Sequence, residues 1–269
     1  MITIVCVFSD RPTLDQYLLR SLSNQTAKYQ TVLVDNTEGQ YKSAAQAYNY
    51  GAARAGQKYI MFVHQDVDFE SGMWLRDAEA MLDGIGDLGV AGVAGMSEQG
   101  RTLQDRGRNV IINHENREAW KFGNPIDKPE PVQTLDGCVL IVPSKVFNIL
   151  KFDEAVCDNW HLYDVDYCLA CRRLGYAVYV IPKSIYHRSA GPWHSRSRIR
   201  ILFSLGALPE TYYKTLGKLI RKYRSDYRFI YTSNGEWNTY QPVIVQRVMV
   251  LIQAGLALVG RNMRRVFKK

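Results

Sequence analysis

Tyr59-Ile60-Met61-Phe62-Val63-His64-Gln65-Asp66-Val67-Asp68 is the stretch that decides the fold. Its first five residues form an apolar run with the length of a buried strand, and polar residues follow at the strand's carboxyl end. If the segment stays extended, Asp66 and Asp68 point to one side of it. Two carboxylates placed so can hold Mg²⁺ or Mn²⁺ and leave positions open for phosphate oxygens. A solvated turn without a metal is the alternative.

Strands and helices are predicted to alternate on both sides of this stretch. Short β-branched runs predict strands, and apolar residues at helical spacing predict the helices between them. The further predicted strands cover residues 2–8, 31–34, 90–94, 135–142 and 177–181, and the predicted helices cover 14–23, 44–55, 73–82 and 164–174. The alternation predicts an α/β fold with a Rossmann-like, mainly parallel central sheet flanked by helices. Ligands bind such sheets at the carboxyl ends of the strands.

The positive charge is concentrated at the end of the chain. The 269 residues carry a formal net charge of +8. Residues 1–195 hold 19 Lys and Arg against 23 Asp and Glu, whereas residues 196–269 hold 15 against 3. We therefore expect a globular domain over 1–195 and a basic helical region over 196–269. Five cysteines without a recurring spacing, and no basic leader before the first strand, favour a reduced, cytoplasmic protein.

Residues 245–267 are predicted to form an amphipathic helix. Gln and Arg side chains gather on one arc, and large apolar side chains fill the opposite arc. Arg247 interrupts the apolar run, so a membrane-spanning helix is not expected. The pattern favours residues 240–269 lying on an anionic membrane surface at the inner face of the plasma membrane. A helix packed on the globular domain over 1–195 or on a second subunit is the alternative, and the broad apolar arc argues against nucleic acid.

Single polar residues at element ends have two interpretations each. Asp35 can accept hydrogen bonds from a base or ribose, or cap the turn after its strand. Asp164 can act as a general base, or stabilise the first turn of its helix. His187 can ligate a metal or contact a phosphate, or be structural. Cys168 and Cys171 have redox spacing, but they lack a nearby Gly, Pro or second pair, so core packing is favoured.

Several segments, taken in chain order, resemble the motifs of bacterial family-2 glycosyltransferases of the GT-A fold over residues 1–190. They are the first strand with Ser9-Asp10-Arg11, Leu19–Gln25, Val34-Asp35-Asn36, Tyr48–Gly56, Asp66-Val67-Asp68, Thr134–Gly137, Tyr163-Asp164-Val165-Asp166, Gly175-Tyr176 and His187. No single segment is specific, but the ordered set is.

The resemblance implies inverting transfer of a sugar from a nucleotide diphosphate sugar, with UDP expected and dTDP the alternative. The acceptor would be a hydroxyl of a glycan or lipid-linked oligosaccharide in bacterial surface polysaccharide synthesis. The implied ligands of Mn²⁺ or Mg²⁺ are Asp66, Asp68 and His187, and the implied base is Asp164. The implied donor-nucleotide residues are Phe8, Ser9, Asp10, Arg11, Asp35, Asn49 and Asp66, and those toward the acceptor and sugar are Asp136, Gly137, Trp160 and Asp166. The polar, Gly- and Pro-containing composition of residues 97–133 itself predicts a long loop or lid with one hairpin, and the resemblance implies that it closes over the donor.

Two departures from the family pattern matter. Tyr163 stands where the family has Glu, so both Asp164 and Asp166 remain candidates for the base. The QxxRW motif of processive members is absent, because Gln246-Arg247-Val248 lacks the Trp, and this favours addition of one or few sugars.

Two other functions compete with this one. A nucleotidyltransferase would carry a Gly-rich, basic loop after the first strand, and Phe8–Pro12 is not such a loop. An inactive carbohydrate-binding or scaffold protein of the same fold would have no need of Asp66, Asp68 and Asp164.

Overall fold

The computed structural model describes residues 1–109, 111–113, 123–188, 208–249 and 252. The chain divides into two compact units, one made of Met1–Arg188 with Ile230–Glu236, the other of Ser189–Phe229 with Trp237–Lys269. The boundary predicted near residue 195 lies outside the described residues. So does most of the helix predicted over 245–267.

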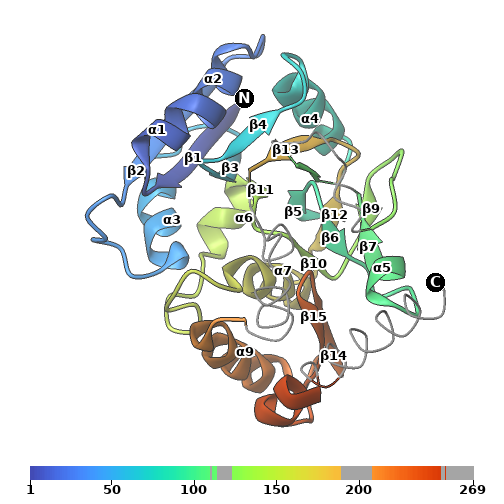
Figure 1. The fold of residues 1–269 in the computed structure, drawn as a ribbon. Helices are drawn as coiled ribbons and strands as arrows, with labels where there is room; N and C mark the ends of the chain where they lie inside the picture. Colours follow the sequence, from blue (N-terminus) through green and yellow to red (C-terminus); the bar gives the residue numbers. More distant parts are fainter. Residues whose placement is uncertain (110, 114–122, 189–207, 250–251, 253–269) are drawn as a thin grey trace, which may run out of the picture. The chain divides into compact units, whose positions relative to one another are not determined.

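A seven-stranded mixed sheet forms the centre of the first unit (Figure 1). Its strands, in spatial order, are β2 (Tyr29–Asp35), β1 (Ile2–Phe8), β3 (Tyr59–His64), β11 (Val139–Pro143), β5 (Leu88–Gly92), β12 (Ala177–Val180) and β9 (Glu130–Pro131). β1 pairs in parallel with β2 and β3, and β12 pairs in parallel with β5. β11 is antiparallel to both of its neighbours, and β9 is antiparallel to β12. The predicted α/β fold with a mainly parallel sheet is confirmed.

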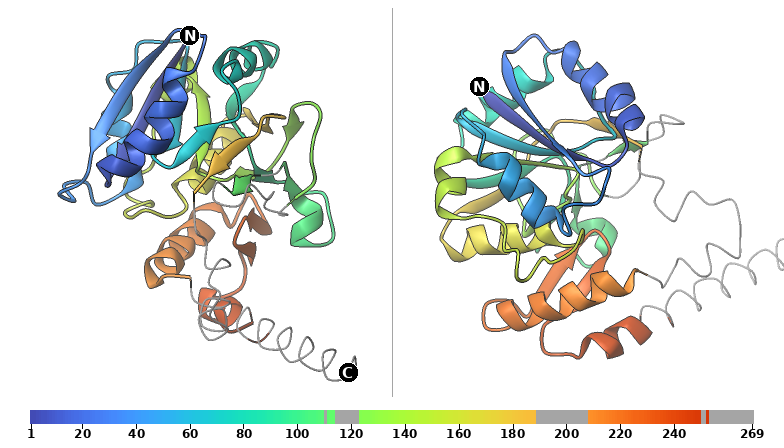
Figure 2. Two further views of the ribbon diagram at one scale, coloured as in Figure 1. Left: turned by 45° about the horizontal axis from the view of Figure 1, so that its top comes forward. Right: turned by 90° about the vertical axis from the view of Figure 1, so that its left-hand side faces the viewer.

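Helices cover both faces of this sheet (Figure 2). On one face lie α1 (Arg11–Leu14), the π-helical turn η1 (Asp15–Leu19), α2 (Arg20–Ser23) and α4 (Trp74–Asp83). On the other lie α3 (Ala44–Ala52), α6 (Ser144–Ile149) and α7 (Tyr163–Arg173). Along β3, Met61 and Val63 pack into the first core and Ile60 and Phe62 into the second. Burial on both faces explains why the strand reads as a continuous apolar run.

Two smaller sheets extend from the carboxyl ends of the central strands. One contains β10 (Thr134–Leu135), β6 (Gly95–Met96) and β7 (Gly107–Arg108), and the other contains β4 (Val67–Phe69), β13 (Ile185–His187) and β8 (Ile112–Asn113). β6 and β7 pair antiparallel, around the short helix α5 (Leu103–Arg106). The strand predicted over 135–142 is two strands, β10 and β11, separated by residues 136–138. Residues 110 and 114–122 of the predicted lid lie outside the described residues.

The cysteine pair of α7 belongs to the core. Cys168 and Cys171 are both fully buried free thiols in the second core cluster. Burial raises the pKa of each thiol above its usual range. The core-packing interpretation of this pair is confirmed, because a reactive cysteine needs an exposed site that favours the thiolate.

The second unit is built around α9 (Glu210–Tyr223), which buries one aromatic and apolar face. The strands β14 (Phe229–Thr232) and β15 (Gly235–Asn238) come next in the chain, and their residues Ile230–Glu236 belong to the first unit. Residues 243–249 of the second unit are helical. Tyr212 and Tyr213 contact the buried ring of Trp237. Within the described ranges, we find no helix that is both long and apolar enough to cross a membrane.

Candidate active site

The carboxyl ends of β2, β1 and β3 lie side by side. The strand register places Phe8 opposite Asp35 and Val7 opposite His64. The side chain of Gln65 joins two of these ends, because its Oε1 accepts hydrogen bonds from the backbone N–H groups of Ser9 and Asp10 at 2.9 and 3.1 Å. The polar groups expected at the strand ends therefore share one edge of the sheet, as ligand sites of α/β sheets require.

His64, Asp66 and His187 form a group that can hold a metal ion. Their ligand atoms all lie within 4.8 Å of one another. His187 Nε2 is 3.1 Å from Asp66 Oδ1 and 3.4 Å from His64 Nδ1. Two imidazoles and one carboxylate are a donor set that binds divalent transition metals and leaves coordination positions open.

The electrostatics of this group suit a ligand site. Burial raises the pKa of Asp66, but the hydrogen bond and charge of His187, with the charge of His64, outweigh it and bring the pKa to about 2. Burial lowers the pKa of His64, and His187 lowers it further. For His187, burial lowers the pKa but the contact with Asp66 raises it overall. Asp66 is thus ionised at neutral pH, as a metal ligand must be.

Asp68 lies apart from this group. Residues 65–66 form a turn and β4 begins at Val67, so Asp66 and Asp68 do not share one side of an extended segment as expected. His187 pairs with Val67 while Tyr186 pairs with Asp68, which puts Asp68 and His187 on opposite faces of the β4–β13 ribbon. Asp68 Oδ2 accepts a hydrogen bond from Arg20 at 2.8 Å. Its metal role stays a prediction.

Asp164 stands at the start of α7, opposite the turn 136–138. Gly137 permits this approach: a Cβ there would lie 2.6 Å from the hydroxyl oxygen of Tyr163 and 3.1 Å from Asp164 Oδ2. Burial, and then the negative charge of Asp136, raise the pKa of Asp164 to about 7. A half-buried carboxyl with such a pKa is suited to general-base work near neutral pH. Asp166 is only 2% exposed, but which of the two carries the chemistry stays a prediction.

Tyr163 connects the two sides of the site. Its hydroxyl donates to the backbone carbonyl of Gly137 at 3.0 Å, and His64 Nε2 lies 3.0 Å from the same oxygen. Sequence reasoning singled out neither His64 as a ligand nor Tyr163 as its partner. The available signal was the position of His64, two residues before Asp66 in the decisive stretch.

The other predicted donor residues are engaged locally. Asp35 accepts hydrogen bonds from the Thr37 N–H and hydroxyl at 2.8 and 2.7 Å, which lower its pKa, and this is the turn-capping arrangement. Asn49 donates to the Phe152 carbonyl at 2.9 Å and to Glu154 at 2.8 Å. Contacts of these side chains to a nucleotide stay predictions.

Three more predicted residues either bond within their own segment or lie exposed. Asp10 caps α1 by accepting a hydrogen bond from the Thr13 N–H at 2.9 Å, and Arg11 pairs with Asp15. Trp160 is 43% exposed in the loop before α7. Contacts of Asp10, Arg11 and Trp160 to the donor or the acceptor stay predictions.

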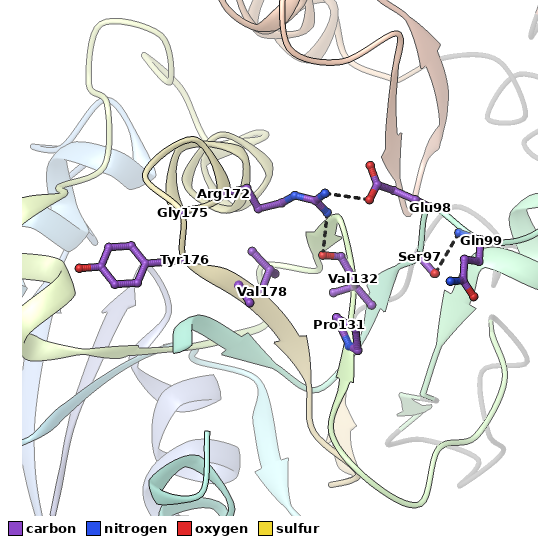
Figure 3. Close-up of a pocket in the computed structure, with 10 residues that line it drawn as sticks. Ser97, Glu98, Gln99, Pro131, Val132, Arg172, Gly175, Tyr176 and Val178 are labelled. Carbon is purple, nitrogen blue, oxygen red and sulfur yellow. Dashed lines mark hydrogen bonds and ion pairs between the residues drawn. The ribbon is translucent and has the colours of Figure 1, made fainter. Parts of the chain in front are cut away.

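A separate cavity of about 410 Å³ lies where α7 ends beside β9 and β12 (Figure 3). Arg172 reaches across it, with hydrogen bonds to Glu98 at 2.8 Å and to the Val132 carbonyl at 3.2 Å. Its lining is Ser97, Glu98, Gln99, Pro131, Val132, Arg172, Gly175, Tyr176, Ala177 and Val178. None of the predicted catalytic, metal or donor residues belongs to this set, so the cavity is distinct from the strand-end site.

Solved structures share the fold at low sequence identity. The mannosyltransferase PcManGT from Pyrobaculum calidifontis, in complex with GDP-Man and Mn²⁺, aligns with a TM-score of 0.56 and 12% identity, over 97% of this chain and 75% of that one. GalNAc-T7, in complex with UDP, GalNAc and Mn²⁺, aligns with a TM-score of 0.52 and 13% identity, over 70% of this chain. The alignment spans 43% of the GalNAc-T7 chain.

Sequence comparison assigns the family. No curated protein sequence matches the chain. The model of the family described as "Glycosyltransferase like family" matches residues 3–201, which is most of the chain. With that match and the GT-A fold of its structural neighbours, the chain belongs to the glycosyltransferase-like family and is a glycosyltransferase of the GT-A type.

Proposed function

We propose that the protein is an inverting, non-processive glycosyltransferase that uses a divalent metal and a nucleotide diphosphate sugar. The observation that carries this proposal is the connection through Tyr163. It joins a group able to hold a metal, His64, Asp66 and His187, to the start of the helix that carries Asp164. A site with an ionised ligand group and a carboxyl of pKa about 7 has the two functions that sugar transfer needs.

The roles follow from the chemistry of each group. Asp66, His187 and His64 would hold Mn²⁺ or Mg²⁺, which neutralises negative charge on the leaving diphosphate. Asp164 takes the proton from the acceptor hydroxyl while that oxygen forms its bond to the anomeric carbon. The bond from this carbon to the diphosphate oxygen breaks on the opposite face, so the configuration inverts and the nucleoside diphosphate leaves with the electron pair.

The two ligands are proposed by class. UDP is the first candidate nucleotide, with dTDP and GDP next, and Asp35 at the end of β2 would contact the base or ribose. The acceptor would be a hydroxyl of a glycan or lipid-linked oligosaccharide of the kind used in bacterial surface polysaccharide synthesis.

A panel of nucleotide sugars with Mn²⁺ tests this function. We expect one UDP, dTDP or GDP sugar to raise the melting temperature only with metal present, and to be slowly hydrolysed without acceptor. A protein that binds the donor yet neither hydrolyses nor transfers it would be the inactive binding protein instead. Release of pyrophosphate from a sugar phosphate and a nucleoside triphosphate would identify a nucleotidyltransferase.

We further propose that the helical segment after residue 242 lies on an anionic membrane surface at the inner face of the plasma membrane. Its polar side chains make contacts within the second unit: Gln246 is 7% exposed and hydrogen-bonds to the backbone of Asn238, and Arg247 forms an ion pair with Glu210. Its apolar side chains are 46–63% exposed, namely Ile244, Val245, Val248, Met249 and Ile252. An apolar face surrounded by a strongly basic sequence fits anionic lipid.

Liposome flotation tests the membrane proposal. The variant with Val248→Asp and Met249→Asp should lose binding to vesicles that contain phosphatidylserine. Ile149→Asp with Leu174→Asp is the matched control, because these exposed apolar residues lie in the first unit and are expected to leave binding unchanged. Wild-type protein that stays unbound and sediments as a dimer, broken by the first variant only, would instead make this face a subunit contact.

A further inference from the structure

Tyr163 lies beside His64, with its hydroxyl held in a fixed place. Its side chain is 5% exposed and packs between the rings of Tyr48 and Phe152, with centroids 5.5 and 5.8 Å away. This packing holds the hydroxyl at one place, between the Gly137 carbonyl and His64 Nε2. The residue is therefore fixed by the core and faces the site only through its oxygen.

The two hydrogen bonds of the Tyr163 hydroxyl together fix the direction of its proton. The Gly137 carbonyl, 3.0 Å away, is only an acceptor, so Tyr163 must donate to it. A phenol has a single proton, so once it is donated to Gly137 the Tyr163 oxygen offers a lone pair to His64 Nε2. The hydrogen bond at 3.0 Å therefore requires a proton on His64 Nε2.

The opposite side of the His64 ring agrees with this assignment. Neutral imidazole carries one proton, so a proton on Nε2 leaves a lone pair on Nδ1. Nδ1 is the atom that faces His187 Nε2 at 3.4 Å, within the ligand group. Both neighbours of the ring thus select the tautomer that can bind a metal through Nδ1.

We infer that His64 is a metal ligand through Nδ1, and that Tyr163 is the positioning residue that holds it in this tautomer. The inference rests on the proposed function for its metal but needs neither donor nor acceptor. A metal-ligating histidine commonly bonds its second ring nitrogen to a fixed partner, and loss of that partner weakens metal binding by about 10–100-fold. Here the partner is a tyrosine hydroxyl oriented by a backbone carbonyl.

The arrangement also couples the two halves of the site. Tyr163 and Asp164 are consecutive residues in the first turn of α7, so the group that orients the metal ligand and the proposed base move together. A Glu at position 163 would be acceptor-only when ionised, and could not donate to the Gly137 carbonyl.

The test is Mn²⁺ binding by the full chain, measured by electron paramagnetic resonance with Mn²⁺ as the only added ligand. Tyr163→Phe should weaken binding by about 10–100-fold, and His64→Ala by at least as much. Tyr167→Phe is the matched control: it removes a hydroxyl from the same helix and aromatic cluster, where that hydroxyl donates to the Leu150 carbonyl at 3.2 Å. This control should bind within about twofold of wild type, and the melting temperatures of the two Phe variants should be similar.

A second readout reports the tautomer without metal. Long-range ¹H–¹⁵N correlation spectra of histidine-labelled protein should show His64 protonated at Nε2, and Tyr163→Phe should shift it toward the other tautomer while Tyr167→Phe does not. Equal Mn²⁺ affinity of the two Phe variants, unchanged binding by His64→Ala, or no binding by wild type would overturn the inference. Failure of sugar transfer with these binding differences intact would count against the proposed function alone.

Discussion

Two carboxyl groups of this molecule lie in opposite electrostatic environments. Asp66 has a pKa lowered to about 2, because a hydrogen bond from His187 and the charges of His187 and His64 outweigh its burial. Asp164 has a pKa raised to about 7, because burial is reinforced by the nearby charge of Asp136. When environments separate two carboxyl pKa values in this way, the low one suits a permanently ionised ligand and the high one suits a proton carrier. Asp66 and Asp164 have the same side chain, but their environments suit them to different roles.

The largest effect is expected from removing the proton carrier. Asp164→Asn keeps the shape but cannot accept the acceptor's proton, so kcat should fall by about 10²–10⁴-fold. Donor binding, measured by calorimetry with Mn²⁺, should change little. Asp166→Asn serves as the comparison on the same helix. A loss of transfer in that variant with full activity in Asp164→Asn would reverse the assignment of the base.

The next effect distinguishes the two acids of the decisive stretch. Asp66→Ala removes a carboxylate from the ligand group, and Mn²⁺ affinity should fall by about 100-fold or more. Asp68→Ala removes the ion pair with the half-exposed Arg20, so its effect on Mn²⁺ affinity should be within about threefold. Calorimetric titration of both variants decides between them. Equal losses would restore Asp68 as a ligand, as the sequence pattern predicts.

The sequence could predict the strands because a buried strand shows itself as a run of consecutive apolar residues. β3 was found almost to the residue, since core clusters on both of its faces demand an uninterrupted apolar run. The break between β10 and β11 was missed because it depends on a single turn. There Asp136 accepts a hydrogen bond from the Cys138 N–H at 3.1 Å, which apolar periodicity does not reveal.

The site was predictable only in part because its contacts are distant in sequence. Asp66, Asp164 and His187 could be selected as polar groups at element ends. His64 becomes a ligand candidate only beside His187, which is 123 positions away, and its tautomer depends on Tyr163, which is 99 positions away. The orientation of Asp68 depends on a turn at 65–66 that a strand-end pattern cannot distinguish from an extended segment.

A smaller effect is expected from a substitution at Gly137, which lies against Tyr163 and Asp164. Gly137→Ala places a Cβ 2.6 Å from the Tyr163 hydroxyl oxygen, so that hydroxyl must move. We expect a loss of about 1–3 kcal/mol in the free energy of unfolding, measured in urea, as in other overpacked sites. Gly86→Ala is the control, because a Cβ there meets no atom within 4 Å. Equal stability of the two variants would mean that the contact at Gly137 is relieved without cost.

The smallest expected effect is the pH dependence that Asp164 imposes. Since the base must be deprotonated and its pKa is about 7, log kcat/KM should rise with unit slope below pH 7 and level off above it. At pH 6, kcat/KM should be about tenfold below the plateau, provided that Mn²⁺ saturates the site. Because His64 and His187 also take up protons, Mn²⁺ binding is measured at each pH to check this saturation.

Asp136→Asn can still accept the Cys138 N–H but removes a negative charge, so the rising limb should move to lower pH. Burial alone would keep that limb above the usual range of a carboxyl group. A limb unmoved in Asp136→Asn would show that another group controls the profile, and the difference between Asp66 and Asp164 would then not explain the chemistry.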